Sequence, residues 1–436
     1  MARAKKETAL TPEERLQAAL VPDWEWPHKL PENWCWTYLT KAAECLDNFR
    51  KPINATERAG RNGNVPYYGA TGQVGWIDDF LTDEDLVLLG EDGAPFLDLI
   101  KDKAYLITGK AWVNNHAHIL RSLFGDTGNR YLLHYLNSFN YAGYVNGTTR
   151  LKLTRASMDT IPIPLPPLAE QQRIVDRIES LFAKLDEAKE KAQAVVDSFE
   201  NRKAAILHKA FTGELTAKWR EEHGVSIDNW KTTRFDSVAA IRSNLVDPAE
   251  YQSFPHIAPD NIEKKTGVLL EYHTIAEDGV TSGKHRFYSG QILYSKIRPY
   301  LSKAVVVDFD GLCSADMYPI EAYQNARCLW YYMLSDEFLL QASTAGSRSV
   351  LPKINQKELS ALTVHLPTND REQEEIARIL DELFDKEQQT KEAAEVVLDQ
   401  IDLMKKSILA RAFRGELGTN DPSEESAVEL LKRTIL

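Results

Sequence analysis

Residues 203–215 read Lys-Ala-Ala-Ile-Leu-His-Lys-Ala-Phe-Thr-Gly-Glu-Leu, and residues 405–417 read Lys-Lys-Ser-Ile-Leu-Ala-Arg-Ala-Phe-Arg-Gly-Glu-Leu. The same offset of 202 residues relates Glu170-Gln171 to Glu372-Gln373, and Leu181-Phe182 to Leu383-Phe384. Self-similarity at a fixed offset indicates a chain built from equivalent structural units. The sequence therefore predicts two copies of one unit.

The repeated segments have the apolar spacing of a coiled coil, with alternating steps of four and three residues. In the first copy the predicted seam comprises Ile174, Ile178, Leu181, Leu185, Val195, Phe199 and Ile206. In the second it comprises Ile376, Leu380, Leu383, Val397, Ile401, Met404 and Ile408, with polar breaks at Glu387 and Thr390. Gly213 and Gly415 follow the last periodic residues, where helices commonly end on a left-handed glycine. We predict one helix over 168–211 and a second equivalent helix.

If the two helices pair with each other, the repeat determines their orientation. Related copies that pack about a two-fold axis perpendicular to their length run antiparallel, so we predict an antiparallel coiled coil. The alternative is two amphipathic helices, each packed only on its own globular domain.

The remaining segments predict two mixed α/β domains. Prolines at 161–167 and 364–367 stop strand and helix alike, and so mark boundaries. Short apolar runs at 86–89, 105–108, 291–294 and 304–307 predict strands, while 128–138 and 326–341 predict local helices. Thr11 and Glu14 form a capping box for a short N-terminal helix. The predicted fold class is α+β, with an internal pseudo-two-fold repeat and six segments: a lead with a short helix (1–26), domain 1 (27–166), spacer helix 1 (167–227), domain 2 (228–366), spacer helix 2 (367–418) and a tail (419–436).

Composition restricts the class of protein. The 436 residues are 43% hydrophobic and carry a net charge of −12, which at first argues against a nucleic-acid partner. The four cysteines form no CxxC pair, and the sequence shows neither a secretory leader nor a membrane-length apolar run, so we expect a reduced, cytoplasmic chain. Both domains are nearly neutral, with 14 basic and 15 acidic residues in 27–166 and 14 and 16 in 228–366. The acidic excess lies in 367–436, with 10 basic and 17 acidic residues.

Basic and hydrogen-bonding side chains gather in glycine-punctuated loops of both domains. Such side chains hold phosphates and read base edges, although each loop alone is typical of a solvated turn. The candidates in domain 1 are Arg58, Arg61, Asn62, Tyr67, Tyr68, Thr71, Asn114, His116, Thr148, Thr149, Arg150 and Lys152. Those in domain 2 are Lys284, His285, Arg286, Lys296, Arg298, Ser347, Arg348, Ser349 and Lys353.

Catalytic motifs are missing from the sequence. It contains no GxxxxGK[ST] phosphate loop, no strand-linked GxGxxG and no Asn- or Asp-Pro-Pro-aromatic tetrapeptide. His116 and His118 could bind a metal from one strand face, but no partner pair follows at ligand spacing, so we expect packing or a DNA contact and no metal. The acidic string around Asp260 and Glu263 is interpreted as surface charge. We therefore expect no catalytic residue in this chain.

Several motifs resemble one family. The segment Pro-Leu-Pro-Pro-Leu-Ala-Glu-Gln-Gln-Arg-Ile at 164–174, the ending Ala-Phe-Thr-Gly-Glu-Leu-Thr at 210–216 and its second copy resemble the specificity (S) subunit of type I restriction-modification enzymes. Tyr-Tyr-Gly-Ala-Thr-Gly at 67–72 and Ser-Lys-Ile-Arg-Pro at 295–299 add to the likeness. The second pre-helix signature differs by one extra residue around 366–372, so its match is weaker.

The resemblance implies a function in host defence. Each domain would be a target recognition domain that reads one half of a split, asymmetric double-stranded DNA sequence. The coiled coil would set their spacing and dock two methyltransferase (M) subunits for adenine-N6 methylation. Those partners and any restriction (R) subunit would bind S-adenosylmethionine, ATP and Mg, so this chain would hold no cofactor. A scaffold with peptide-binding domains and a self-sufficient methyltransferase or nuclease are the competing classes.

Overall fold

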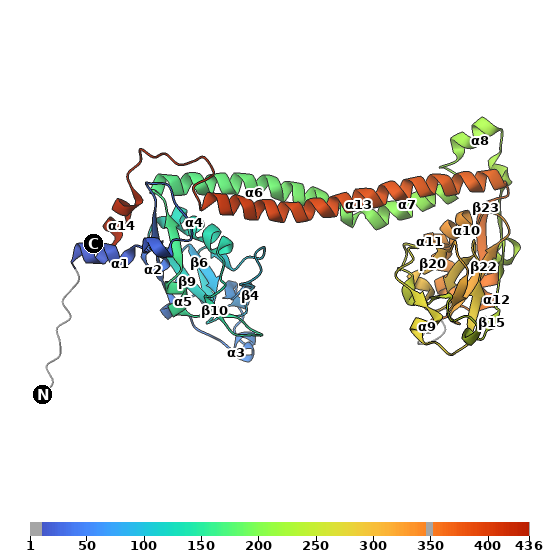
Figure 1. Ribbon diagram of the computed structural model, residues 1–436, viewed down its shortest axis with the longest axis horizontal. Helices are drawn as coiled ribbons and strands as arrows, with labels where there is room; N and C mark the ends of the chain where they lie inside the picture. The colour runs from blue at the N-terminus through green and yellow to red at the C-terminus, as the bar shows by residue number, and fades with distance from the viewer. Residues whose placement is uncertain (1–10, 346–351, 436) are drawn as a thin grey trace. The chain divides into compact units, whose positions relative to one another are not determined.

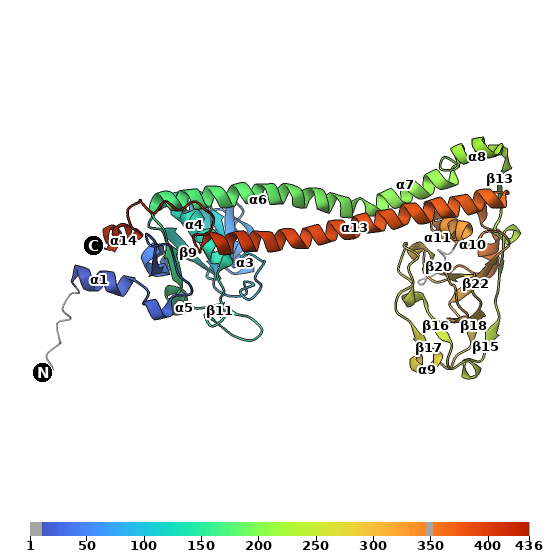
Figure 2. The ribbon, with the colours of Figure 1, turned by 45° about the horizontal axis from the view of Figure 1, so that its top comes forward.

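The computed structural model describes residues 11–345 and 352–435. The chain divides into two compact units, one made of Met1–Ala192 with Val396–Leu436 and the other of Gln193–Glu395. Each unit holds one mixed α/β domain and a stretch of paired long helices (Figures 1 and 2). In the described part of the chain, no helix is both long enough and apolar enough to cross a membrane.

The domain of the first unit contains two small sheets and a closing ribbon. The antiparallel sheet has the order β2-β9-β6-β7 (Ala43–Cys45, Ala117–Ser122, Leu86–Gly90, Ala104–Ile107). The second sheet has the order β4-β3-β8-β5 (Gly72–Ile77, Val65–Gly69, Lys110–Val113, Thr82–Asp83), with β3 parallel to β8. The ribbon pairs β1 (Cys35–Tyr38) with β12 (Pro162–Leu165), and a hairpin pairs β10 (Val145–Asn146) with β11 (Lys152–Leu153). The shorter helices are α1 (Pro12–Ala19), α2 (Leu39–Ala42), α3 (Ala55–Ala59), α4 (Gly125–Ser138), α5 (Arg155–Asp159) and α14 (Ala427–Ile435).

The domain of the second unit repeats this plan. Its antiparallel sheet has the order β14-β22-β19-β20 (Ala239–Ile241, Met317–Ala322, Ile292–Ser295, Ala304–Val306). Its second sheet has the order β15-β18-β21-β16-β17 (Leu245–Val246, Lys284–Phe287, Gly311–Cys313, Pro255–Ile257, His273–Thr274), again with one parallel pair, β16 and β21. The closing ribbon pairs β13 (Trp230–Arg234) with β23 (Thr363–Pro367). The shorter helices are α8 (Ala217–His223), α9 (Ile275–Asp278), α10 (Ala326–Met333), α11 (Asp336–Ala345) and α12 (Gln356–Ala361).

The long helices are α6 (Leu168–Asp197), α7 (Phe199–Phe211) and α13 (Asp370–Ala412). In the first unit, α6 and α13 are joined by Asp186–Lys405 (2.5 Å) and Lys189–Asp402 (2.9 Å). Later residues of one helix therefore meet earlier residues of the other. In the second unit, Lys391 of α13 lies over Phe199 of α7, Arg202 pairs with Glu387, and Lys203 lies over Phe384, so the two helices again run in opposite directions. The predicted antiparallel pairing is confirmed within each unit.

Each helical pair also packs on its domain. In the first unit Phe413 lies edge-to-face against Tyr131 and Tyr135, with ring centroids 5.3 and 5.1 Å away. In the second, Phe211 meets Tyr332 edge-to-face at 5.0 Å. Phe211 and Phe413 are the repeat-related phenylalanines, and each anchors the domain of its own unit. The alternative of two helices packed only on globular domains is wrong, because the helices also pair with each other.

The predicted seam of the second helix is wrong at Val397 and Met404, which are 40% and 50% exposed. The buried stripe passes through Ala394 and Ile401; the half-buried Leu398 lies between them, and the half-buried Lys405 follows Ile401. A lysine can hold a seam position because its aliphatic stem packs while its charge finds a partner. Lys405 does this beside Asp186, so a polar residue displaces the hydrophobic one that sequence spacing favours.

The prediction of one unbroken helix over 168–211 is also wrong, because a break at Ser198 separates α6 from α7. The Ser198 hydroxyl donates to the carbonyl of Ala194 (2.6 Å), and Arg202 donates to the carbonyl of Val195 (3.2 Å). Side chains that take backbone acceptors compete with the helical ladder. The predicted helix over 326–341 likewise divides into α10 and α11, where the Ser335 hydroxyl accepts from the N–H of Phe338 (3.4 Å).

Local helix signals are confirmed. Thr11 and Glu14 form the capping box of α1. Gly213 and Gly415 end their helices with φ of 80° and 72°, a conformation that side chains disfavour.

The repeated Glu-Gln pair lies buried where each long helix begins. In the second unit, the Glu372 carboxylate accepts hydrogen bonds from four side chains: Thr216 Oγ1 (2.8 Å), Arg220 Nη1 (2.7 Å), Asn229 Nδ2 (2.9 Å) and Trp230 Nε1 (3.0 Å). Burial alone would raise the pKa of Glu372, but these donors lower it. The glutamate of the repeated pair therefore forms a polar corner that joins α13 to the segment after α7.

The first unit has the equivalent corner, built from the C-terminal segment. Glu170 accepts from Thr419 Oγ1 (2.6 Å) and from Arg173 Nε (3.0 Å). Here burial dominates and raises the pKa of Glu170. Residues 427–435 form α14, whose Ala427 and Leu431 pack with Leu16 and Ala19 of α1, so the C-terminal segment is part of the fold of this unit.

Candidate nucleic-acid interface

In the first domain, the turn after β6 gathers several predicted residues. Asp92 Oδ1 lies 2.7 Å from Nη2 of Arg150 and 2.8 Å from Nδ1 of His116. Glu91 lies 3.0 Å from Nζ of Lys152 and also pairs with Arg50. Burial would raise the pKa of Glu91, yet hydrogen bonds from Arg50 and Lys152 lower it. Arg150, His116 and Lys152 thus each contact one of two neighbouring acids, Asp92 or Glu91.

Sequence reasoning missed Glu91 and Asp92, although both directly follow the apolar run that forms β6. The Arg150 side chain is 61% exposed, so its guanidinium is held by Asp92 and still faces solvent. Thr148 and Thr149 are exposed in the loop between β10 and β11, next to it. This group of oriented polar side chains is the strongest candidate interface of the first domain.

Two arginines stack on aromatic rings of the second sheet of this domain. The Arg58 guanidinium lies 4.8 Å from the Tyr67 ring centroid, and that of Arg61 lies 4.6 Å from the ring of Trp112. Tyr67 and Trp112 are register partners on β3 and β8. Tyr67 is only 1% exposed and its hydroxyl accepts from the N–H of Ile53 (3.3 Å), so its prediction as a direct contact is wrong. It supports Arg58 instead.

The other candidates of the first domain divide by burial. Asn62 and Thr71 are exposed, while Tyr68 is half-buried beside Tyr105. Asn114 is buried and its Oδ1 accepts from the N–H of His116 (2.8 Å). Asn114 therefore shapes the turn before β9 and does not face a ligand, which corrects its prediction as a contact.

In the second domain, Arg286 is surrounded by aromatic rings. Its guanidinium lies 4.9 Å from the Tyr288 centroid, 5.4 Å from Tyr251 and 5.9 Å from Phe254. Lys284 and His285 are buried, because β18 lies inside its sheet between β15 and β21, and burial lowers the pKa of both. These two predictions as direct contacts are wrong, while Arg286 stays half-exposed.

Three further candidates of the second domain, Lys296, Arg298 and Lys353, lie around the turn after β19. Lys353 Nζ lies 3.1 Å from Asp316 Oδ1, and Lys296 donates to the carbonyl of Ala315. Arg298 is exposed and adopts a left-handed backbone with φ of 47°. Ser347, Arg348 and Ser349 lie outside the described residues.

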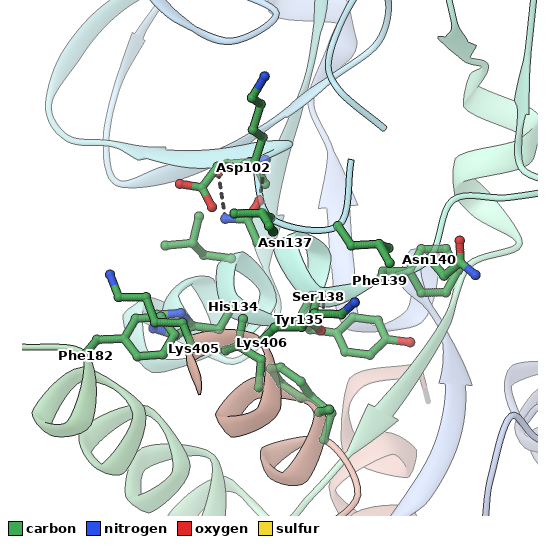
Figure 3. Close-up of a pocket in the computed structure, with 18 of the residues that line it drawn as sticks. Asp102, His134, Tyr135, Asn137, Ser138, Phe139, Asn140, Phe182, Lys405 and Lys406 are labelled. Atoms are coloured by element: carbon green, nitrogen blue, oxygen red, sulfur yellow. Dashed lines mark hydrogen bonds between the residues drawn. The ribbon is translucent and has the colours of Figure 1, made fainter. Parts of the chain in front are cut away.

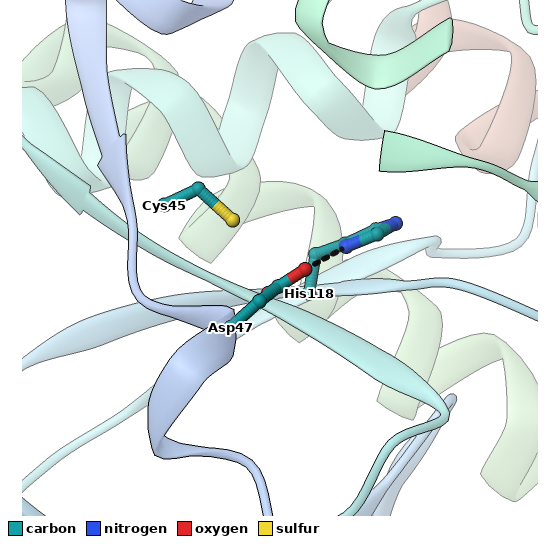
Figure 4. A group of neighbouring side chains, drawn as sticks. All are labelled: Cys45, Asp47 and His118. Atoms are coloured by element: carbon teal, nitrogen blue, oxygen red, sulfur yellow. Dashed lines mark hydrogen bonds and ion pairs between the residues drawn. The ribbon is translucent and has the colours of Figure 1, made fainter. Parts of the chain in front are cut away.

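One group of metal-type ligands comes together among the described residues, formed by Cys45, Asp47 and His118 (Figure 4). His118 Nδ1 lies 2.7 Å from Asp47 Oδ2 and its Nε2 lies 3.0 Å from the carbonyl of Leu153. Both ring nitrogens therefore already have an oxygen partner within the domain. Burial raises the pKa of the Cys45 thiol to about 12. The geometry favours a structural role, in which His118 links β9 to β11. His116 pairs with Asp92 instead, so the two histidines do not converge.

Each unit has a groove where its domain meets the helices. In the first unit a groove of about 940 Å³ is lined by α4, residues 99–106 and the end of α13, and there Lys405 lies 5.0 Å from the ring centroid of Phe182 (Figure 3). In the second unit a groove of about 1380 Å³ has the repeat-related pair Lys203 and Phe384 at 5.4 Å. Lys203 donates to the carbonyls of Lys265 (2.9 Å) and Thr266 (3.0 Å), and burial lowers its pKa to about 8. The repeated lysine thus takes different partners in the two units.

Known proteins are similar to this chain in sequence and in fold. A family model described as the type I restriction modification DNA specificity domain matches residues 45–196 and 227–397. The specificity subunit of the type I restriction enzyme EcoDI of Escherichia coli is 35% identical over 410 residues, covering 89% of this chain and 90% of that subunit. The EcoKI specificity subunit of E. coli strain K12 is 25% identical over 320 residues, covering 66% and 65%.

Solved structures agree on the fold. The HsdS subunit of Thermoanaerobacter tengcongensis matches with a TM-score of 0.55 at 18% identity, covering 90% of this chain and 100% of that chain. A chain from a structure of a type I restriction-modification system matches with a TM-score of 0.65 at 17% identity and the same coverage. This chain belongs to the type I restriction-modification DNA specificity family. It is a specificity subunit of that type, with two DNA specificity domains.

Proposed function

We propose that the two domains read the two halves of one bipartite, asymmetric DNA target. The observation that carries this proposal is a shared topology with different side chains at equivalent loops. The turn after β6 has Glu91 and Asp92 in the first domain, whereas the equivalent turn after β19 has Lys296 and Ile297 in the second. Base readout depends on side chains at such positions, so two unlike loops favour two unlike half-sites.

The proposal extends to the helices and partners. The coiled coil fixes the separation of the half-sites and docks two methyltransferase subunits, and through them any restriction subunit, in the cytoplasm. Adenine-N6 methylation, S-adenosylmethionine, ATP and Mg belong to those partners, and this chain contributes recognition without catalytic residues. The residues repeated at an offset of 202 support two equivalent docking sites.

A domain exchange tests the division of the target. Residues 27–166 are replaced by the same region of a relative with another specificity, and methylated adenines are mapped in cells that express the chain with its methyltransferase partner. One half-site should change and the other should stay. A change in both halves contradicts the modular proposal.

A matched deletion tests the spacing role. Residues 193–196 and 394–397 are removed together, which takes four residues from each helix and keeps the antiparallel partners in step. Four helical residues span about 6 Å, close to the rise of two base pairs. The spacer of the methylated sequence should shorten by about two base pairs, and an unchanged spacer would contradict the proposal.

Two further measurements separate the competing classes. A DNA reader loses affinity steeply as salt rises, because phosphate contacts release counterions, whereas a peptide-binding scaffold shows no DNA affinity of that kind. Incubation with labelled S-adenosylmethionine should methylate DNA only when the partner is present. Methylation by this chain alone would assign it an enzymatic role.

A further inference from the structure

In both domains the turn after an inner strand of the antiparallel sheet, β6 or β19, forms the same backbone hydrogen bonds with a later segment of the chain. In the first, the N–H of Leu153 donates to the carbonyl of Glu91 (2.7 Å), and the N–H of Gly93 donates to that of Leu151 (3.0 Å). In the second, the N–H of Ile354 donates to the carbonyl of Lys296 (2.9 Å), and the N–H of Arg298 donates to that of Pro352 (2.7 Å). Single β-bridges between them, Asp92 with Lys152 and Ile297 with Lys353, complete the match.

This match makes Gly93 and Arg298 equivalent positions. Both have left-handed backbones, with φ of 73° and 47°. Glycine adopts that conformation freely, whereas an arginine there is strained. Strained residues of this kind concentrate at functional sites, where the side chain is needed. The strained backbone at Arg298 therefore indicates that the arginine side chain has a role at this position.

The first domain shows what occupies the space at this position. A Cβ atom added to Gly93 would lie 3.2 Å from Nε of Arg150, so the guanidinium of Arg150 lies directly over the glycine. Arg150 reaches this place from the segment before β11, and Asp92 fixes it. In the second domain the residue equivalent to Gly93 is itself an arginine, Arg298. Both domains thus have an arginine at the same turn, from different parts of the chain.

We propose that Arg150 and Arg298 are the specificity-determining arginines of the first and second domains, each reading a guanine of its own half-site. This inference rests on the proposed function. A guanidinium can donate two hydrogen bonds to O6 and N7 of guanine, and a carboxylate that holds it increases its geometric precision. Asp92 also neutralises the charge of Arg150, which suits a neutral base edge better than a phosphate.

The test uses the complete methyltransferase complex. Arg150→Ala and Arg298→Ala are each assayed for methylation of the cognate duplex and of duplexes with single base changes in either half-site. Each substitution should reduce discrimination about 5- to 150-fold at one base pair, in one half-site only, and the two variants should affect opposite halves. Arg130→Ala and Arg242→Ala are controls, because both are exposed arginines paired with acids, Glu179 and Glu321, outside this turn.

Arg298→Gly separates side-chain function from backbone strain. Glycine relieves the left-handed strain, so the melting temperature should rise while discrimination falls as in Arg298→Ala. Unchanged discrimination in the glycine variant, or a uniform loss on all duplexes, overturns the inference. If the wild-type complex methylates without sequence preference, the proposed function itself fails, which is a separate result.

Discussion

The buried corner at Glu372 allows a quantitative prediction for Glu372→Ala. The Glu372 side chain is fully buried, and Arg220, its charged partner, lies 2.7 Å away and is itself 11% exposed. Removing the carboxylate leaves that guanidinium without its counter-charge, along with donors from Thr216, Asn229 and Trp230. Breaking a buried ion pair from one side costs about 3–5 kcal/mol, so we expect the second unit to lose that much unfolding free energy.

Two variants calibrate this value. Glu372→Gln keeps one acceptor oxygen and the shape of the side chain, so its loss should be smaller than that of alanine. Glu375→Ala removes a carboxylate one turn later on the same helix, where Arg378 is the exposed partner (2.7 Å). Surface ion pairs contribute little, so this control should stay close to wild type.

Denaturant unfolding with hydrogen exchange gives the readout. Because the chain has two compact units, a single transition need not describe it, and exchange in β13 and α8 reports on this corner directly. Protection there should fall in Glu372→Ala, while protection in β6 and β9 of the first unit stays. A loss below about 1 kcal/mol, or equal losses in Glu372→Ala and Glu375→Ala, would refute the role of the corner.

Three other outcomes are expected. The hydrogen-bonded Glu372 has a lowered pKa, so its stabilisation is present above its unfolded pKa of about 4.3 and is lost as pH falls below that value through the lower folded pKa. Glu170 has a raised pKa, so its contribution favours folding as pH falls from its folded pKa toward about 4.3. Hydrogen-exchange protection should therefore rise at the Glu170 corner above about pH 4.3 as pH falls, and should decrease at the Glu372 corner only below about pH 4.3. Cys45 is half-buried and its pKa is raised to about 12, so it should react slowly with iodoacetamide at pH 8; rapid labelling in the native protein would contradict this raised pKa. Deletion of 426–436 removes the buried Leu431 from α1 and should cost the first unit about 2–4 kcal/mol, measured by denaturant unfolding against deletion of 434–436.

The sequence signals that predicted the fold correctly were local or repeated. The 202-residue offset was sufficient to predict two units and antiparallel helices, and the capping box and glycine ends fixed helix boundaries. The seam phase at Val397 and Met404 could not be predicted, because the choice of Lys405 depends on Asp186 in a distant segment. The break at Ser198 has the same origin, since side chains compete for carbonyls that a spacing pattern does not describe.

The candidate site was predictable in residue type but not in pairing. Loops rich in Arg, Thr and Asn marked the region, and Arg150, His116 and Lys152 do come together. The acidic partners of these residues could not be predicted from the sequence, because Glu91 and Asp92 approach β11 only through long-range backbone pairing. Tyr67, Lys284 and His285 failed for the opposite reason: each lies in a loop-like sequence that the fold turns into an interior strand position.

These pairings also explain how a chain of net charge −12 can belong to a DNA specificity family. Arg61, Arg150 and Lys152 each have an acidic partner within 3.0 Å, so these three cations create little long-range attraction for phosphate. Non-specific affinity grows with unpaired basic charge, whereas discrimination depends on donors held at base edges. Basic side chains that are paired with acids therefore contribute little to non-specific DNA affinity, but their donor groups stay oriented. Under the proposed function, a subunit built in this way would gain selectivity from its own loops and leave much of the phosphate binding to the methyltransferase subunits.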